Sequence, residues 1–243
     1  FPMARIHSLP TCDETEDLSA RSLPAWVYED EDFFALERTR IFMPSWQLIC
    51  HEADVPNAGD YLTFDFMGEP LVALRGADEA VRVFFNVCRH RASRLLDGPQ
   101  GNCGRALRCP YHAWTYGLDG ALRKAPYEKT FEAFDKAAHG LVQPQTEVWN
   151  GFVFARLEDD GGPSIAALMA PYAEELAPYR FAEMRPLGRV TLRPRPVNWK
   201  NITDNYADGL HIPVAHDGLA SLFGSSYRIE VAGMVLKMSG EPV

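Results

Sequence analysis

The sequence lacks several features that would place it in a familiar class of proteins. No run of about eighteen apolar residues occurs in the chain, so no transmembrane helix is expected. Residues 1–7 contain no apolar core of the kind found in a signal peptide. The Gly-x-Gly-x-x-Gly fingerprint of dinucleotide-binding folds is also missing. We therefore expect a soluble, cytoplasmic protein that binds no nicotinamide cofactor itself.

Basic residues are scarce relative to acidic residues. The 243 residues include 24 lysines and arginines against 33 aspartates and glutamates, which gives a formal net charge of −9. Nucleic-acid binding needs a basic surface that can neutralise phosphates, so we expect no nucleic-acid partner. Hydrophobic residues make up 47% of the chain, enough for a packed core in one large domain or two small ones.

Cysteine is rare too, and two of the five cysteines lie in a pattern with histidine. Cys88 and His90 form a Cys-x-His pair. After eighteen intervening residues, Cys109 and His112 form a Cys-x-x-His pair. Ligands two or three residues apart lie on one tight loop, and two such loops can close four donors around a metal centre. Zinc is one candidate, but zinc sites usually pair Cys with Cys and His with His, so a mixed-ligand iron–sulfur cluster is favoured.

The residues that follow favour the same interpretation. Residues 112–120, with the sequence HAWTYGLDG, resemble the second loop and the turn of the Rieske family. The resemblance implies a [2Fe-2S] cluster in which Cys88 and Cys109 hold one iron and His90 and His112 hold the other. An odd and dispersed remainder of cysteines fits reduced thiols better than a disulfide framework. These cysteines are Cys12, Cys50 and Cys103.

A second candidate metal site lies further along the chain. Asp204, Asp208 and His211 are spaced i, i+4 and i+7, which predicts that they share one face of a helix. His216 comes five residues after His211, so a regular helix would rotate it by about 140°. Pro213 predicts a bend or break between the two histidines, which would let their rings converge on one ion. Two histidines and a carboxylate form the facial triad of non-haem iron oxygenases.

This stretch resembles the mononuclear-iron motif of Rieske non-haem iron oxygenase α subunits, Glu-Asn-Tyr-x-Asp/Glu-x-x-His-x-x-x-x-His. The first position is Asp204 instead of Glu, and the others agree: Asn205, Tyr206, Asp208, His211 and His216. Without the first motif, two histidines at this spacing would more often be unrelated. Together the two motifs resemble an α subunit of the aromatic-ring-hydroxylating type. The resemblance implies that His211 and His216 bind Fe(II), and that Asp208 is a catalytic bridge to a Rieske histidine of a neighbouring subunit.

The resemblance also implies a third iron ligand, a carboxylate far downstream on the catalytic domain. The later carboxylates in this sequence are Asp217, Glu230 and Glu241. None of them lies in the family's third-ligand context, so none is assigned. We therefore expect that the sequence is incomplete and that it omits much of the catalytic sheet.

Local patterns predict an α+β fold. β-forming runs between turn signals predict a small antiparallel domain with strands at 61–66, 71–75, 81–86 and 151–156. Helices are expected at 28–43, after Ser164 with a kink at Pro171, and from near Trp199. Further strands are expected at 190–193 and 227–238, and no internal repeat is expected.

Three parts of the chain follow from these elements. Residues 1–43 are expected to be an N-terminal arm, over 1–24, and a helix that packs on the catalytic domain. Residues 44–157 are expected to form the Rieske domain, inserted in a mixed α/β catalytic domain. Residues 158–243 are expected to be the N-terminal part of that catalytic domain.

The resemblance implies the terminal oxygenase component of a Rieske oxygenase. It would use O2 and electrons from NAD(P)H, relayed by a reductase or ferredoxin, to hydroxylate, dihydroxylate or demethylate a small organic substrate, with an aromatic compound expected first. A homotrimer is expected, since in a head-to-tail ring each subunit both donates electrons to one neighbour and accepts electrons from the other. A β subunit could be present as well. One alternative is an electron-transfer Rieske protein with a non-catalytic second domain. Another is a zinc protein, which would be colourless.

The stretch between the ligand pairs is unusually basic. Five arginines face a single acid, Asp97, which gives a local charge of +4: Arg89, Arg91, Arg94, Arg105 and Arg108. These arginines could pair with carboxylates elsewhere in the fold. Alternatively they could dock an acidic electron donor, with an attraction that weakens as salt rises.

Overall fold

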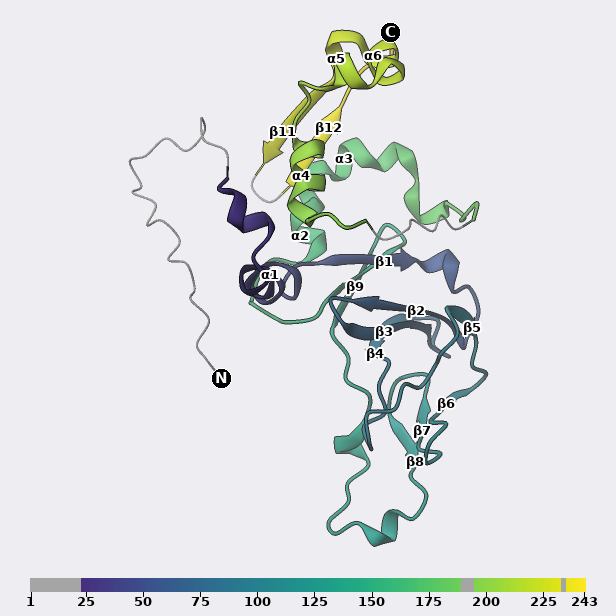
Figure 1. Ribbon diagram of the computed structural model, residues 1–243. Helices are drawn as coiled ribbons and strands as arrows, with labels where there is room; N and C mark the ends of the chain where they lie inside the picture. The colour runs from purple at the N-terminus through teal and green to yellow at the C-terminus, as the bar shows by residue number, and fades with distance from the viewer. Residues whose placement is uncertain (1–22, 189–194, 233–234) are drawn as a thin grey trace. The chain divides into compact units, whose positions relative to one another are not determined.

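The computed structural model describes residues 23–188, 195–232 and 235–243. They form two compact units (Figure 1). The larger unit comprises residues 38–190, and the smaller unit combines the residues before 38 with those after 190. The arm expected at 1–24, except for its last two residues, and the strand expected at 190–193 lie outside the described residues. In the described part of the chain, no helix has both the length and the apolar character needed to cross a bilayer.

The larger unit is built on a four-stranded antiparallel sheet with the order β4-β3-β2-β5. Its strands are β2 (Asp60–Phe66), β3 (Glu69–Arg75), β4 (Val81–Phe85) and β5 (Gln100–Asn102). The central strand β3 is buried on both faces, as its apolar run of Leu71 to Leu74 predicts. Because side chains alternate along a strand, β3 contributes to two separate cores.

The first core contains Val72 and Leu74 from one face of β3. Against this face packs a second sheet, β6-β7-β8, whose strands are β6 (Ala106–Arg108), β7 (Thr115–Gly117) and β8 (Leu122–Lys124). Cys88, Cys109 and Tyr116 belong to this same core. The two cysteines of the ligand motif are therefore anchored in packed interior.

The second core contains Leu71 and Ala73 from the opposite face of β3. It is completed by a three-stranded sheet with the order β1-β10-β9, whose strands are β1 (Gln47–His51), β10 (Phe152–Arg156) and β9 (Gln145–Trp149). The four predicted strands are confirmed within two residues at each end. The small antiparallel β domain is confirmed.

Helices in the larger unit are short and interrupted. Ser164 caps α2 (Ile165–Met169) by accepting a hydrogen bond from the N–H of Ala167. The chain then alternates between 3₁₀ and α turns, with the bounds η7 (Ala170–Tyr172), α3 (Ala173–Leu176) and η8 (Ala177–Tyr179). The break predicted at Pro171 is confirmed, and Pro178 adds a second one. Further 3₁₀ turns are η4 (Glu52–Asp54), η5 (Glu128–Thr130), η6 (Ala137–His139) and η9 (Phe181–Glu183).

The helix expected at 28–43 is divided into three pieces. They are η2 (Ala25–Tyr28), α1 (Glu31–Glu37) and a π-helical turn, η3 (Arg38–Phe42). The Asp30 carboxylate accepts the N–H of Phe33 at 2.7 Å, so it caps the start of α1. The first two pieces belong to the smaller unit and η3 belongs to the larger unit.

The smaller unit consists of short helices and one hairpin. Its further elements are α4 (Trp199–Ala207), α5 (Ile212–Ala215), α6 (Asp217–Phe223), η10 (Gly224–Ser226), β11 (Arg228–Ala232) and β12 (Val235–Ser239). The strands expected within 227–238 are these two antiparallel strands. A buried ion pair joins α1 to α4, with Lys200 Nζ 2.7 Å from Glu37 Oε1. The indole N–H of Trp199 donates to the other Glu37 oxygen at 2.9 Å, so both carboxylate oxygens are satisfied.

Candidate functional site

The two loops that carry the first ligand motif have the same backbone design. In one, Cys88 N–H donates to Ser93 O and Ala92 N–H donates back to Cys88 O, at 2.8 and 3.0 Å. In the other, Cys109 N–H donates to Trp114 O and Ala113 N–H donates back to Cys109 O, at 2.8 and 3.1 Å. The two loops therefore match residue for residue from each cysteine, although their histidines stand at different spacings.

Both loops contain an alanine in the left-handed region, Ala92 with φ 53° and Ala113 with φ 59°. A non-glycine residue held there costs on the order of 1–3 kcal/mol, and it persists only where the surrounding structure fixes it. Such strain is concentrated at functional sites. Here it turns each loop back after its histidine, so that both loops face one another.

The two cysteine sulfurs are buried and interact with each other. Burial raises the pKa of the Cys88 thiol above its ordinary value, and the neighbouring Cys109 adds to the effect. Burial also opposes ionisation of Cys109, but the backbone N–H groups of His112 and Tyr111 lower its pKa below the ordinary value. Two facing thiols served by backbone donors form the thiolate half of an iron–sulfur ligand set.

Tyr116 supports the Cys88 side of the site. Its ring is fully buried, and its Oη lies 3.3 Å from Cys88 Sγ. The same oxygen accepts the N–H of Arg89 at 3.0 Å, which leaves the phenolic proton free to point at the sulfur. Burial and the neighbouring Cys88 raise the pKa of Tyr116, so the phenol keeps that proton.

The two histidines of the motif face each other, with ring centroids 4.6 Å apart. His90 also stacks on the buried ring of Trp114, at 4.9 Å and 7° between the planes. Within the described ranges, His90 Nδ1 is the buried side-chain polar atom that has no hydrogen-bond partner. A buried nitrogen without a partner is costly unless another group takes it, and a metal ion is such a group.

The donor set fits a cluster with two irons better than a single metal ion. Among the described residues, no three Cys, His, Asp or Glu side chains are grouped closely enough to hold one ion. A Rieske cluster needs only two side chains for each iron. Two buried cysteines on one side and two facing histidines, one with an orphaned nitrogen, satisfy that requirement.

The second candidate site differs from the sequence prediction in its helix. Helix α4 ends at Ala207, and Asp208 is its extended C-cap, with φ −101° and ψ 116°. The prediction that Asp204, Asp208 and His211 share one helix face is therefore wrong. Asp204 instead accepts a hydrogen bond from the Tyr28 hydroxyl at 2.7 Å.

The predicted position of the break is also wrong. The helix is interrupted before His211, and Pro213 lies in the first turn of α5, where its missing N–H would have had no helical partner. A second interruption follows at His216, which separates α5 from α6. Because of these two interruptions, the rings of His211 and His216 lie 5.1 Å apart.

A pocket of about 270 Å³ contains both histidines. Its lining is mixed polar and aromatic: Asn205, Tyr206, Asp208, His211, Ile212, His216, Leu219 and Tyr227. One Asp208 oxygen lies 3.7 Å from His211 Nδ1, and the other accepts the N–H of Leu210 at 2.7 Å. The pocket therefore brings together the two histidines and the carboxylate that the motif singled out.

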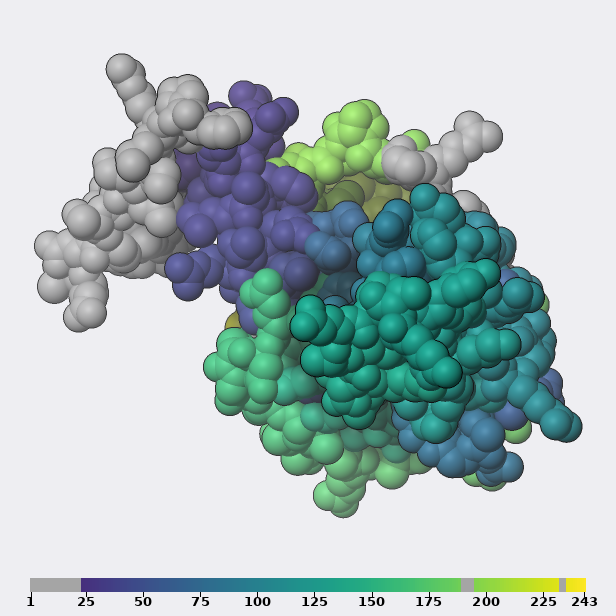
Figure 2. Space-filling view, turned by 90° about the horizontal axis from the view of Figure 1, so that it is seen from below, coloured from purple at the N-terminus to yellow at the C-terminus, as the bar shows by residue number. Residues whose placement is uncertain are grey.

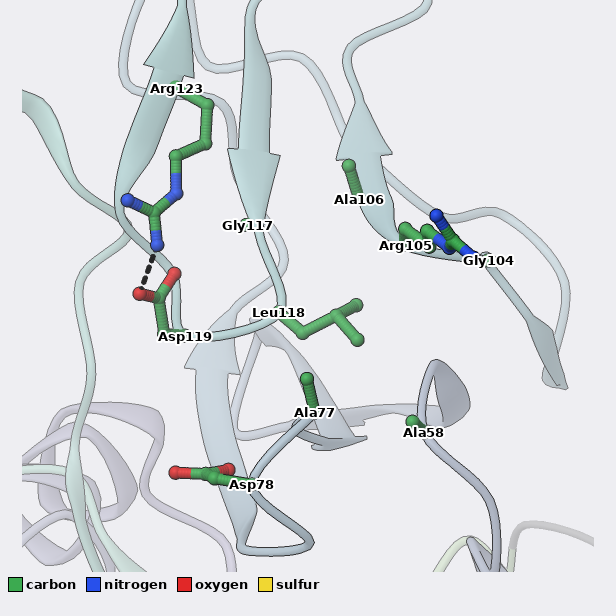
Figure 3. Close-up of a pocket in the computed structure, with 10 residues that line it drawn as sticks. All are labelled: Ala58, Ala77, Asp78, Gly104, Arg105, Ala106, Gly117, Leu118, Asp119 and Arg123. Atoms are coloured by element: carbon green, nitrogen blue, oxygen red, sulfur yellow. Dashed lines mark hydrogen bonds and ion pairs between the residues drawn. The ribbon is translucent and has the colours of Figure 1, made fainter.

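The arginines near the cluster loops fall into two groups. Arg94 pairs with Asp65 at 2.7 Å, as expected if the basic stretch is neutralised within the fold. Arg89, Arg91 and Arg108 are exposed and form no ion pair with any described residue. Arg105 lines a separate cleft (Figure 3).

That cleft, of about 720 Å³, lies at the ends of β6 and β7 that are opposite the cluster loop. Two turns with related sequences line it, GADEAVR at 76–82 and GLDGALR at 117–123. Each is closed by the same backbone bond, from the glycine N–H to the alanine carbonyl. Each also pairs its aspartate with its arginine, as Figure 3 shows for Asp119 and Arg123. The two carboxylates that line the cleft are therefore both paired with an arginine of the same turn.

Comparison with known proteins adds two family matches. The Rieske [2Fe-2S] domain matches residues 45–136, and the ring hydroxylating alpha subunit (catalytic domain) matches residues 181–236. Both cluster loops lie in the first range and the His211–His216 pair lies in the second. The two domains imply a Rieske cluster and a mononuclear iron.

Individual relatives agree with these matches. The carnitine monooxygenase oxygenase subunit of Escherichia coli (strain K12) is 36% identical over 207 residues, which cover 83% of this chain and 54% of the relative. The glycine betaine monooxygenase oxygenase subunit of Chromohalobacter salexigens is 36% identical over 198 residues, covering 82% and 44%. The solved structure of the quaternary ammonium Rieske monooxygenase CntA matches with a TM-score of 0.82 at 31% identity, covering 91% and 62%. The chain spans about half the length of these curated relatives.

Proposed function

The chain belongs to the Rieske oxygenases, as part of an α subunit, and on that basis we propose that the full-length protein is a terminal oxygenase. It would use O2 and electrons from NAD(P)H, delivered by a separate reductase or ferredoxin. One observation carries the proposal: the chain holds a second pocket with two facing histidines and a carboxylate besides the cluster loops. An electron carrier with a non-catalytic second domain would have no need of that pocket.

In this proposal Cys88 and Cys109 hold one iron of the cluster, and His90 and His112 hold the other. The orphaned Nδ1 of His90 and the backbone donors around Cys109 support the assignment. When bound, the cluster supplies one-electron transfer and the mononuclear iron supplies oxygen activation. The protein's part is to bury the sulfurs and to fix both loops by their paired backbone bonds.

For the mononuclear iron we propose His211 and His216 as ligands. Asp208 faces the Nδ1 side of His211, so it can hold that ring and leave Nε2 as the ligating nitrogen. We further propose that Asp208 reaches a Rieske histidine of a neighbouring subunit, which makes it a catalytic residue for electron delivery. A head-to-tail homotrimer meets this need, because every subunit is then both donor and acceptor.

We propose a quaternary ammonium compound as the substrate, oxidised at a methyl group. The relatives that act on carnitine and glycine betaine support this class. Tyr206 and Tyr227 line the pocket beside the histidines, and aromatic faces bind quaternary ammonium groups. An aromatic substrate, the first expectation from sequence, remains the second candidate because the matched catalytic family is described as ring hydroxylating.

Domain limits and location complete the proposal. We assign residues 44–157 to the Rieske domain, residues 1–43 to an N-terminal segment of the catalytic domain, and residues 158–243 to the first part of that domain. A cytoplasmic location is proposed because Cys103, a described cysteine outside the cluster set, is a free thiol, which suits a reducing compartment.

Metal analysis and turnover test the proposal together. The purified full-length protein should be brown, with iron and acid-labile sulfide in the ratio that one [2Fe-2S] cluster and one further iron require. Cys88→Ser and Cys109→Ser should each lose the colour, since a hydroxyl does not replace a thiolate at neutral pH. A colourless zinc protein, or serine variants with full iron and sulfide, would contradict the assignment.

Turnover is measured with the protein's own reductase, NAD(P)H and O2, against carnitine, glycine betaine and naphthalene in parallel. Product formation from either quaternary ammonium compound supports the first substrate class. Oxidation of naphthalene alone would select the ring-hydroxylating candidate. A chain that takes up electrons but oxidises no substrate would favour the electron carrier.

A further inference from the structure

A long loop of the larger unit covers one side of the candidate cluster site. After β8 the chain leaves the first core at the buried Ala125 and re-enters it at Leu141. Leu141 N–H donates to Gly120 O at 2.8 Å, which fastens the returning end. The intervening residues 126–140, here called the aromatic loop, form the lower end of the unit in Figure 1 and face the viewer in Figure 2.

The loop contributes three rings to the surroundings of His90 and Trp114. Phe131 packs edge-on against His90 at 5.9 Å and against Trp114 at 6.2 Å. Phe134 contacts Trp114 at 5.4 Å, and His139 contacts it at 5.8 Å. Together with Trp114, which stacks on His90, these rings form a continuous aromatic layer over the His90 side of the site.

The layer is held in place by contacts within the loop. Phe131 and Phe134 lie 5.3 Å apart, and Phe134 and His139 lie 4.7 Å apart. The His139 ring is fixed by a 2.6 Å contact between its Nδ1 and the carbonyl of Asp135. An ion pair between Lys136 and Glu128 crosses the loop at 2.7 Å. The rings are thus a built layer, since each is positioned by a neighbour.

We propose that the aromatic loop is a water-excluding cap that lowers the reduction potential of the cluster; the proposal rests on the cluster assignment above. The physical reason is charge. Two ferric ions, two sulfides and two thiolates sum to zero with neutral histidines, so uptake of one electron makes the reduced cluster anionic. An anion is less stable beside apolar rings than beside water. Solvent exposure is one of the factors that set such potentials.

The test uses the full-length protein carrying Phe131→Ala and Phe134→Ala together. Opening the layer should admit water and favour the reduced cluster. At a fixed applied potential, the ratio of reduced to oxidised cluster should rise about tenfold, equivalent to ~59 mV for a one-electron couple. Redox titration followed by visible circular dichroism measures it. Pulsed electron paramagnetic resonance of the reduced cluster in D2O should detect added deuterons.

Two controls separate the cap from general disturbance of the loop. Tyr127 lies in the same loop and is 84% exposed. Tyr127→Ala should therefore keep the reduction potential of the parent protein. Phe131→Leu with Phe134→Leu retains apolar bulk and should also stay near the parent value. If the double alanine variant does not keep its cluster, the two single alanine variants are used, and each should shift in the same direction by less.

If the reduction potential of the alanine variants is unchanged or lower than the parent's, the proposal that the loop is a water-excluding cap is wrong. It is also wrong if Tyr127→Ala and the double variant change the reduction potential equally, since exclusion of water at His90 would then not be the cause. A parent protein without iron and sulfide contradicts the proposed function instead, so the two failures are distinguishable.

Discussion

At the scale of single residues, Tyr116 shows how one hydroxyl can adjust the cluster site. Its oxygen already accepts the N–H of Arg89, so its proton is available to Cys88 Sγ. A donor at the sulfur stabilises the reduced, more negative cluster. Tyr116→Phe should therefore lower the reduction potential, and the reduced fraction at a fixed potential should fall about tenfold, or ~59 mV. Redox titration of the full-length protein checks this.

Tyr111→Phe is the matched control for this variant. Tyr111 lies next to the candidate ligand His112, but the residue is 62% exposed, and in the described structure the hydroxyl that contacts Cys88 Sγ is that of Tyr116. Its removal should leave the potential near the parent value. A Tyr116→Phe potential equal to the parent's, or raised above it, would mean that the hydroxyl does not serve the thiolate.

Asp208 provides the second prediction at this scale. Asp208→Asn keeps the shape of the side chain and removes its charge, so both metals and the oligomer should persist. Product formation should fall by at least about a hundredfold, the upper end of the loss seen when a partner behind a metal ligand is removed. Turnover assays with metal analysis measure it.

Asp204→Asn is the comparison, because Asp204 bonds Tyr28 and does not line the histidine pocket. It should retain most of the activity. Wild-type turnover in Asp208→Asn, or a fully active monomer, would refute the proposed bridge between subunits.

The sequence identified residues whose spacing is typical of metal ligands. It did not identify residues that reach the site only when the chain is folded. Cys88, His90, Cys109 and His112 could be proposed as one set because each pair sits within a single tight loop. Tyr116 and Phe131 had no such signal, since they reach the site only through the packing of β7 and of the aromatic loop. Tyr116 does lie within the HAWTYGLDG stretch that carries the family resemblance, and that stretch was the available hint for it.

At the scale of secondary structure, α4 is anchored through Lys200. Both members of the Lys200–Glu37 pair are more than nine-tenths buried. Removing one member leaves the other as an unpaired charge in the interior. Lys200→Met should lower the free energy of unfolding of the smaller unit by about 3–5 kcal/mol. Urea unfolding followed by tryptophan fluorescence reports it.

Lys200→Met combined with Glu37→Leu should recover much of that loss, because neither charge is then left alone. Arg180→Ala, which removes an exposed ion pair with Glu183, is the surface control and should have little effect. If Lys200→Met unfolds like the parent, the pair does not anchor the helix.

The limits of the strands that were predicted are more accurate than those of the helices, and the reason is physical. β-forming runs between turn signals depend on each strand's own sequence, so they locate β2, β3 and β4 within two residues. Helix limits here depend on local breaks: the C-cap at Asp208 and the interruption at His216 both divide an apparently continuous period. For the same reason the helix face predicted for Asp208 and His211 was wrong although both residues reach the same pocket.

At the scale of the whole molecule, the charge around the cluster loops is opposite in sign to the net charge of the chain. The chain carries −9, yet three exposed arginines without an ion pair in the described structure surround the cluster loops. The sequence left open whether the five arginines are neutralised within the fold or dock a donor, and it could not show that Arg94 pairs with Asp65 from another strand. It also could not place Arg105 in the separate cleft. Those facts depend on pairing between distant segments.

The remaining three arginines predict how an electron donor approaches, given the proposed function. Arg89, Arg91 and Arg108 lie on or beside the loops that hold the candidate ligands, so an acidic donor would be drawn to the cluster. Replacing all three with Gln should slow reduction of the cluster by the acidic reductase about tenfold at low salt, and the salt dependence should flatten. Stopped-flow measurements at several ionic strengths test this, with Arg105→Gln as the control. The proposal is contradicted if the rate of cluster reduction in the parent protein does not change with ionic strength. It is also contradicted if Arg105→Gln slows reduction as much as the triple variant does.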